Sequence, residues 1–260
     1  MRVQRQSAGS ASSSSLHGRC VVITRPVGSA TSLVRQVRAA GGVPVVLPGM
    51  ALRGAADAGV ARAALLAALG DELLVFTSPT AVRFAARLAP LCTSAAVLAV
   101  GQGTARALRR HGVGAPLVPR RQDSEGLLGH PALGSVRDRR VALIGAPGGR
   151  GVLGRELTAR GAHLREVHVY RRVPARLDRR HVAALLGLRP SARVLLSSAE
   201  ALHNLHGQLP PPARARWLAA TAVVSSDRLA AAAHAAGFAR VVVAASALST
   251  DLLEAALRVV

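Results

Sequence analysis

Short apolar segments recur along the chain, and each ends in a turn of Gly, Ser, Thr or Pro that leads into a stretch of helical character. These segments lie at 20–24, 73–76, 96–100, 141–144, 194–196, 222–224 and 241–244. Unbroken apolar runs of this length are typical of strands buried on both faces of a parallel sheet. Their alternation with helical stretches predicts an α/β fold in which helices cover both faces of parallel sheets.

An internal repeat indicates that this pattern forms two similar lobes. The segment Leu-Val-Phe-Thr-Ser78-Pro-Thr-Ala-Val resembles Val-Leu-Leu-Ser-Ser198-Ala-Glu-Ala-Leu, and Ser124-Glu-Gly-Leu-Leu resembles Ser249-Thr-Asp-Leu-Leu at nearly the same separation. Matches at a constant offset are the signature of a duplicated structural unit. We therefore expect two lobes, each a parallel sheet flanked by helices.

Two segments break the strand–helix rhythm and are candidates for the connection between the lobes. Residues 163–173 alternate apolar and polar side chains, which predicts a strand with one wet face, and 43–47 is strand-like but contains Pro44. We expect the connecting strands, at 43–52 and 163–175, to pair as a two-stranded antiparallel ladder. Residues 1–18 are rich in Ser and lack acids, and we expect them to form a disordered tail.

The balance of charge narrows the class of ligand. The chain has 34 basic residues, all of them Arg, against 13 acidic ones, for a formal net charge of +21. A genome-wide compositional bias explains such an excess as well as a polyanionic partner does, whether that partner is nucleic acid, an anionic membrane or a polycarboxylate. The arginines are scattered in short runs, and aromatic residues are 2% of the chain. Both features argue against a dedicated nucleic-acid surface.

Familiar catalytic and metal-binding motifs are missing from the sequence. Cys20 and Cys92 have no Cys or His at ligand spacing, which argues against zinc and predicts two buried free thiols in a reducing compartment. There is no Gly-x-Ser-x-Gly elbow, no phosphate-binding loop and no His-x-x-x-His pair. No apolar run is long enough to span a membrane, and the first residues resemble no secretory signal. These absences predict a cytoplasmic location.

Hydroxyl groups and glycines follow almost every predicted strand. The turns are Thr24-Arg25, Thr77-Ser78, Gly101 to Thr104, Gly145 to Arg150, Ser197-Ser198 and Ser225-Ser226. In open parallel sheets ligands bind beyond the carboxyl ends of the strands, where helix amino termini offer free N–H groups to carboxylates or phosphates. Plain helix capping explains any single one of these residues. Six of them on two lobes favour a shared anion-binding cleft.

Tyr170 is the only tyrosine, and it lies in the second connecting segment. One interpretation is an interface residue whose ring is packed and whose hydroxyl is wet. The other is a proton donor that faces the cleft between the lobes. The residues alone leave both interpretations open.

Taken together, these pieces resemble the uroporphyrinogen-III synthase family from about Val21 to Leu253. The resemblance rests on motifs in a fixed order: Ile-Thr-Arg25-Pro, Val-Phe-Thr-Ser78-Pro, Ala-Val-Gly101-x-x-Thr104, Gly148-Gly149-Arg150, Val-x-Val-Tyr170-Arg-Arg and Ser225-Ser226-x-Arg228-Leu. It implies that the first strand and helix join the lobe of the second half. The lobes are then 19–42 with 176–260, and 53–162. The chain departs from the commoner family pattern at Gly145-Ala-Pro and at Ser225-Ser226.

The resemblance also implies a reaction. The substrate is hydroxymethylbilane, a linear tetrapyrrole with eight carboxylates, and the enzyme closes it to uroporphyrinogen III with loss of water and inversion of ring D, in heme biosynthesis. Such an enzyme is a cyclising lyase. No spare apolar face stands out in the sequence, so we expect a monomer, and we expect no cofactor or metal. The resemblance assigns leaving-group assistance to Tyr170 and substrate binding to Arg25, Ser78, Gly101, Thr104, Gly149, Arg150, Ser198, Ser225 and Ser226.

Two other classes of function remain open at this stage. A non-catalytic two-lobed binder of a small polyanionic ligand would use the same cleft without turnover. A nucleic-acid-binding protein is supported by net charge alone, and neither nucleic acid nor a membrane is expected as a partner.

Overall fold

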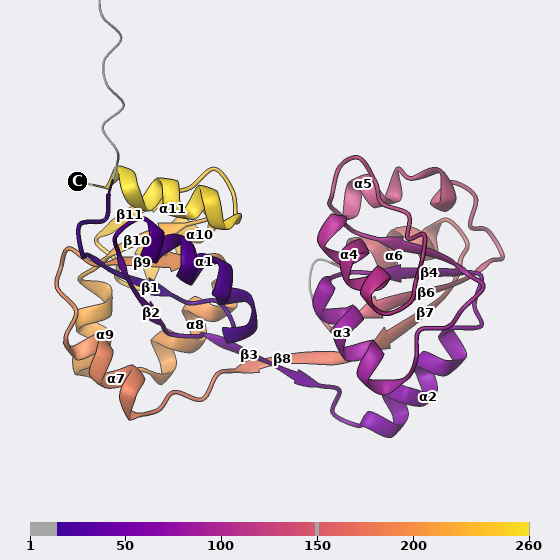
Figure 1. Ribbon diagram of the computed structural model, residues 1–260, viewed down its shortest axis with the longest axis horizontal. Helices are drawn as coiled ribbons and strands as arrows, with labels where there is room; N and C mark the ends of the chain where they lie inside the picture. The colour runs from indigo at the N-terminus through magenta and orange to yellow at the C-terminus, as the bar shows by residue number, and fades with distance from the viewer. Residues whose placement is uncertain (1–14, 149–150, 260) are drawn as a thin grey trace, which may run out of the picture. The chain divides into compact units, whose positions relative to one another are not determined.

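The structure is a computed structural model of the 260-residue chain, and it describes residues 15–148 and 151–259. The chain divides into two compact units. Unit 1 contains the residues up to Ala51 and those from Val173 onward, and unit 2 is the continuous segment Leu52–Arg172. In Figure 1, unit 1 therefore combines the indigo and the orange-to-yellow parts of the chain, whereas unit 2 is mostly magenta.

Unit 1 is built on a five-stranded parallel sheet of order β11-β10-β9-β1-β2. Its strands are β1 (Cys20–Ile23), β2 (Val43–Val46), β9 (Arg193–Leu196), β10 (Thr221–Val224) and β11 (Arg240–Val243). Its helices are α1 (Val27–Ala39), α7 (Arg179–Leu186), α8 (Ala199–Gln208), α9 (Pro211–Leu218), α10 (Asp227–Ala235) and α11 (Ser249–Arg258). The two faces of the sheet carry separate apolar clusters, one around Trp217 and Phe238 and one around Leu33 and Leu252.

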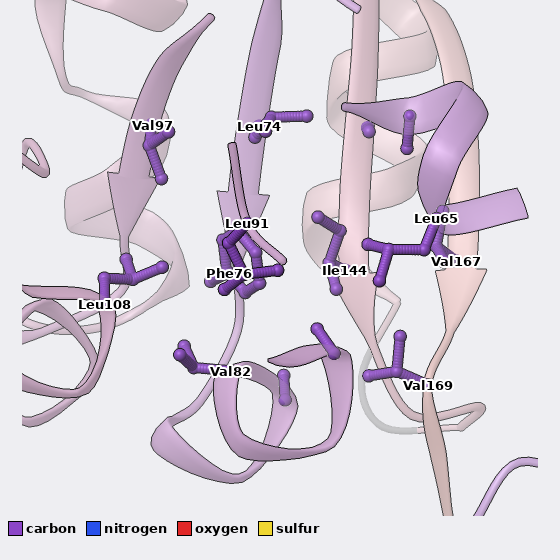
Figure 2. Packing of buried hydrophobic residues seen from close by; sticks show 14 of the residues in the cluster. Leu65, Leu74, Phe76, Val82, Leu91, Val97, Leu108, Ile144, Val167 and Val169 are labelled. Atoms are coloured by element: carbon purple, nitrogen blue, oxygen red, sulfur yellow. The ribbon is translucent and has the colours of Figure 1, made fainter. Parts of the chain in front are cut away.

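Unit 2 is built on a four-stranded parallel sheet of order β5-β4-β6-β7. Its strands are β4 (Leu73–Phe76), β5 (Ala96–Ala99), β6 (Arg140–Gly145) and β7 (His163–His168). Its helices are α2 (Ala58–Ala68), α3 (Pro79–Leu88), α4 (Gln102–Arg110), α5 (Ser124–Leu128) and α6 (Val152–Ala159), with a 3₁₀ turn at Pro131–Leu133. Figure 2 shows side chains of all four strands in one apolar cluster, among them Val97, Leu74, Ile144 and Val167.

A small antiparallel sheet pairs β3 (Met50–Gly54) with β8 (Tyr170–Pro174). The boundaries between the units fall inside these two strands, so the chain leaves unit 1 along β3 and returns along β8. The predicted fold class, parallel sheets flanked by helices with a two-stranded antiparallel ladder, is confirmed.

The residues assigned to that ladder are partly wrong. Val43–Val46, predicted as part of the connection 43–52, is an edge strand that pairs parallel with β1, and an edge strand tolerates the missing N–H of Pro44. Likewise His163–His168, the first part of the connection 163–175, pairs parallel with β6 at the edge of the other sheet. An edge strand with one solvent-exposed face shows the same alternation of apolar and polar residues as a strand of a two-stranded connecting ladder. The sequence pattern alone therefore could not distinguish an edge strand from a connecting strand.

The start of the described chain differs from the predicted tail. Leu16 is 1% exposed and donates its N–H to the carbonyl of Ala40 at 2.9 Å, so residues 15–18 pack against unit 1, while the rest of the tail lies outside the described residues. The cysteines are unpaired, but the prediction that both are buried is wrong: Cys20 is half-buried and Cys92 exposed. Within the described part of the chain, no helix is long and apolar enough to cross a membrane.

Candidate active site

A cavity of about 430 Å³ lies at the carboxyl ends of β4 and β6, within unit 2. Parallel strands direct the loops that follow them to the same edge of the sheet, which is where ligands bind in such folds. The polar side chains that line the cavity are those of Thr77, Ser78, Ser124, Glu166, His168, Tyr170 and Arg172. The cavity therefore unites the turn after β4, the loop after β6 and the strand that leaves the unit.

Ser78 sits at the amino end of α3, directly after β4. Its Oγ accepts the N–H of Ala81 at 3.1 Å, so the capping interpretation is correct for this residue. The same oxygen lies 3.4 Å from the hydroxyl of Tyr170. The neighbouring Thr77 Oγ1 donates to the carbonyl of Ile144 at 3.2 Å, which fixes the turn onto β6. Ser78 thus both starts a helix and borders the cavity.

Tyr170 is the first residue of β8, and its side chain is held from two sides. The ring stacks on Phe84 of α3 with centroids 5.5 Å apart, and its hydroxyl faces Ser78. The residue is 8% exposed, yet it lines the cavity. A phenol that is packed along its ring and open at its oxygen can donate a hydrogen bond to a ligand in a fixed direction.

The described residues of the loop between β6 and α6 that line the cavity are Ala146, Gly148 and Gly151, which carry no polar side chain. A Cβ on Gly145 would lie 2.6 Å from Oγ1 of Thr77, so this position needs glycine. Gly151 caps α6 with a φ of 61°, a conformation that L side chains rarely adopt. The first N–H groups of a helix have no acceptor inside the helix and carry the positive end of its dipole. This loop is therefore suited to an anion, although Gly149 and Arg150, both predicted to bind substrate, lie outside the described residues.

Three charged or titratable side chains of the cavity were not predicted as site residues. Glu166 and His168 approach to 3.7 Å, and Arg172 donates from Nη2 to the carbonyl of Pro147 at 3.1 Å. Together with Tyr170 they occupy every second position of an extended stretch, and alternate positions share one face of a strand. The wet face that the sequence predicted for this stretch is the wall of the cavity, and this was the signal that could have identified them.

Two predicted residues of unit 2, Gly101 and Thr104, are not among those that line this cavity. Gly101 is the N-cap of α4, and the next N–H, that of Gln102, is already accepted by Oε1 of Gln122 at 2.8 Å. Thr104 lies inside α4 and is 3% exposed. Gln122 comes from a loop far along the chain, so the sequence around Gly101 could not reveal that this helix start is covered.

The predicted residues of unit 1 follow its strands, as expected. Ser198 and Ser226 are the N-caps of α8 and α10, accepting N–H groups at 3.3 and 3.4 Å, and Ser225 precedes the second cap. Arg25 donates to Oγ of Ser249 at 3.0 Å and to the carbonyl of Ala247, and burial lowers the pKa of its guanidinium. Among the described residues, no cluster of three or more His, Cys, Asp or Glu could hold a metal ion.

Comparison with known proteins agrees with these features. The family model described as "Uroporphyrinogen-III synthase HemD" matches residues 31–254. The uroporphyrinogen-III synthases of Escherichia coli (strain K12) and Salmonella typhimurium (strain LT2) are each 32% identical over 251 residues, which cover 90% of this chain and 98% of theirs.

Solved structures support the same fold. The uroporphyrinogen-III synthetase of Helicobacter pylori matches with a TM-score of 0.60 at 14% identity, covering 92% of this chain and 98% of that one. A mutant uroporphyrinogen III synthase of the extremely thermophilic bacterium Thermus thermophilus matches with a TM-score of 0.57 at 21% identity, covering 91% and 96%. The sequence matches cover most of the chain, and the chain belongs to the uroporphyrinogen-III synthase family.

Proposed function

We propose that this family member, a cyclising lyase of tetrapyrrole biosynthesis, closes hydroxymethylbilane to uroporphyrinogen III with Tyr170 as the residue that assists the leaving group. The observation that carries this proposal is the fixed phenol in the cavity of unit 2, with its hydroxyl 3.4 Å from Ser78 and its ring stacked on Phe84.

The chemistry of the substrate explains why so little catalytic machinery is needed. Electrons of the pyrrole nitrogen expel the hydroxyl of the bilane, so the substrate supplies most of the driving force. A neutral phenol donates a hydrogen bond or a proton to the departing hydroxide, which leaves as water. The bridge-bearing α-carbon of the last ring then attacks the resulting cationic methylene to give a spiro intermediate. The bond from that α-carbon to its original bridge breaks, the ring's other α-carbon bonds to the freed bridge carbon, and that carbon loses its proton. The net change is loss of one water and inversion of the ring. The enzyme contributes mainly positioning and the stabilisation of developing charge.

The substrate's carboxylates need several separate contacts. In unit 2 the proposal uses the hydroxyl of Ser78, the amide groups at the start of α6 and the guanidinium of Arg172, which all border the cavity. Of the contacts expected from the sequence, Arg25, Gly149, Arg150, Ser198, Ser225 and Ser226 stay part of the proposal. Hydroxyls and helix starts recur among them, and they suit carboxylates for the same reason. Gly101 and Thr104 are withdrawn, because Gln122 covers the start of α4 and Thr104 is buried within it.

We extend the proposal to the setting of the enzyme. Two unpaired cysteines suit a reducing compartment such as the cytoplasm. Each sheet is covered on both faces by helices of the same chain, which supports a monomer. Acid and hydroxyl groups that the chain already holds suffice for the reaction, so the proposal invokes no cofactor. The expected partner is the substrate, and neither nucleic acid nor a membrane is part of the proposal.

The deciding experiment is incubation of the protein with freshly made hydroxymethylbilane, followed by oxidation and separation of the two uroporphyrin isomers. Uncatalysed closure gives the uninverted isomer, so an excess of the inverted isomer over a protein-free control is the expected result. Only the uninverted isomer would reject the proposal. Tight binding of the bilane without any excess of the inverted isomer would instead favour the non-catalytic binder.

A further inference from the structure

A second cavity, of about 500 Å³, lies in unit 1, at the amino ends of the strands of its sheet. Three arginines line it: Arg19 just before β1, Arg193 at the start of β9 and Arg240 at the start of β11. In the sheet register Thr221 of β10 pairs with both Arg193 and Arg240. Arg193, Thr221 and Arg240 therefore form one row across adjacent parallel strands. Side chains at paired positions of parallel strands project from the same face. The fold therefore gathers guanidinium groups at one point.

Arg193 is the central member of this cluster, and its charge is poorly compensated. The residue is 2% exposed, which is rare for an arginine unless it is paired with an acid. Its Nη2 donates to the carbonyl of Val259 at 2.7 Å and its Nη1 to the carbonyl of Ser191, while its Nε is buried without a hydrogen-bond partner. The acceptors are neutral oxygens, so the buried positive charge has no anionic counterpart among them.

The two flanking arginines also donate their hydrogen bonds to neutral carbonyl oxygens. Arg19 donates to the carbonyl of Val259 at 3.4 Å, and Arg240 donates to those of Pro190 and Ala219, both at 2.6 Å. Within the described part of the chain, the cavity lining contains no Asp or Glu. The pKa of Arg193 is lowered, first by burial and then by the positive charges of Arg19 and Arg240. Arg193 is thus close enough to each of the other two arginines to be repelled by it.

The end of α11 accounts for only part of this arrangement. Val259 is the C-cap of that helix, and a helix carboxyl end carries roughly half a negative charge, which a single cation neutralises. Among the described residues, three guanidinium groups leave a surplus of positive charge beside a cavity with room for a small molecule. A guanidinium presents five donors, and those that the carbonyls leave over match the oxygens of phosphate or carboxylate.

We propose that Arg19, Arg193 and Arg240 form a binding site for a small oxyanion, a phosphate or carboxylate group, at the amino edge of the unit 1 sheet. The site lies in unit 1, whereas the cavity proposed for the reaction lies in unit 2. The proposal is therefore independent of the proposed function, and either can fail alone.

The experiment is a titration of the full chain with inorganic phosphate, at constant ionic strength maintained with chloride, followed by calorimetry and by the unfolding temperature. Wild type should show one saturable site. Arg240→Gln removes an exposed guanidinium and should lower the affinity for phosphate roughly tenfold or more, because a charge-assisted hydrogen bond is lost. Arg19→Gln should act in the same direction. These two variants avoid the folding risk of replacing buried Arg193.

The matched control is Arg216→Gln. Arg216 is exposed on α9, which packs on the other face of the same sheet, and its replacement changes net charge equally. It should leave phosphate affinity unchanged. An equal loss of phosphate affinity in Arg216→Gln and Arg240→Gln would mean that net charge alone causes the effect, and it would overturn the proposal. The proposal would also be overturned if neither the wild type nor a chain extended at its carboxyl end bound phosphate saturably.

The extended chain separates two sources of the oxyanion. In a chain that ends at Val260, an α-carboxylate one residue beyond Val259 is a rival of the same chemical class. Adding two glycines after Val260 moves that carboxylate away from Val259. Phosphate binding by the extended chain alone would mean that the chain's own end supplies the oxyanion, whereas equal binding by both chains would mean that the site takes a free one.

Discussion

The hydroxyl oxygens of Tyr170 and Ser78 lie 3.4 Å apart, although the two residues are 92 positions apart in the chain. Ser78 starts a helix directly after β4, and Tyr170 starts the strand that follows the last strand of the same sheet. Ser78 Oγ already accepts the N–H of Ala81. The phenol thus meets an oxygen that is fixed by the backbone, and the two hydroxyls present one polar point to the cavity.

Replacing Tyr170 by Phe removes the donor and keeps the ring that stacks on Phe84. We expect kcat to fall by about 10²-fold, the lower end of the range for a lost general acid. The free energy of unfolding should change by less than about 1 kcal/mol, because packing is retained. Isomer-resolved kinetics and urea unfolding measure the two effects. Unchanged turnover would remove Tyr170 from the mechanism.

Replacing Ser78 by Ala affects stability and substrate binding separately. Loss of the N-cap should cost about 1 kcal/mol of unfolding free energy. KM should rise by less than about tenfold, because many contacts share the carboxylates. Asp57→Ala is the control: Asp57 caps α2 by accepting the N–H of Val60 at 2.9 Å and does not line the cavity. It should lower stability equally without changing KM. Abolished activity in a folded Ser78→Ala protein would contradict shared binding.

Replacing Gly145 by Ala tests the close approach between the β6 loop and Thr77. The added methyl group would lie 2.6 Å from Thr77 Oγ1 and would disturb its hydrogen bond to Ile144. We expect a loss of about 1–3 kcal/mol in unfolding free energy, as for other overpacked sites. Gly207→Ala in α8 has nothing within 4 Å of its new methyl group and should instead stabilise by about 0.5–1 kcal/mol. Unfolding curves that showed the same sign for both variants would refute this account.

Asp178 links stability to pH. Its Oδ1 accepts the N–H groups of His181 at 3.1 Å and Arg180 at 2.9 Å, and these bonds, with the His181 ring, lower the pKa of the carboxyl below its ordinary 3.8. A carboxyl with a lowered folded pKa stabilises the protein above its unfolded pKa, and that contribution is lost as the pH falls through the folded value. Asp178→Asn keeps a capping oxygen and removes the titration.

The variant should therefore lose less stability than wild type as the pH falls below 3.8. Urea midpoints across a pH series measure this difference. Parallel curves for the two proteins would show that the carboxyl does not titrate differently on folding.

The sequence predicted the strands, the fold class and the family because these depend on local apolar runs and on motifs within a few residues. It placed Ser78 and Tyr170 at the same site for the same reason. It could not separate β7 and β2 from a connecting ribbon, because register with a distant strand decides between them. Nor could it show that Gln122 covers the start of α4, because that contact joins two residues 20 positions apart in the chain. The alternation around Tyr170 did predict a wet face, but it did not show that this face lines a cavity.

The order of strands in unit 1 has a consequence for biosynthesis. β1 pairs with β9, whose first residue is Arg193, so the ribosome must reach residue 193 before β1 has its central neighbour. Unit 2 is continuous and can complete its sheet while translation is still under way. During that interval Val21, Val22 and Ile23 lack the β9 strand with which they pair in the folded sheet. Slowing translation after residue 172 should therefore prolong the time in which a chaperone can bind the nascent amino-terminal segment.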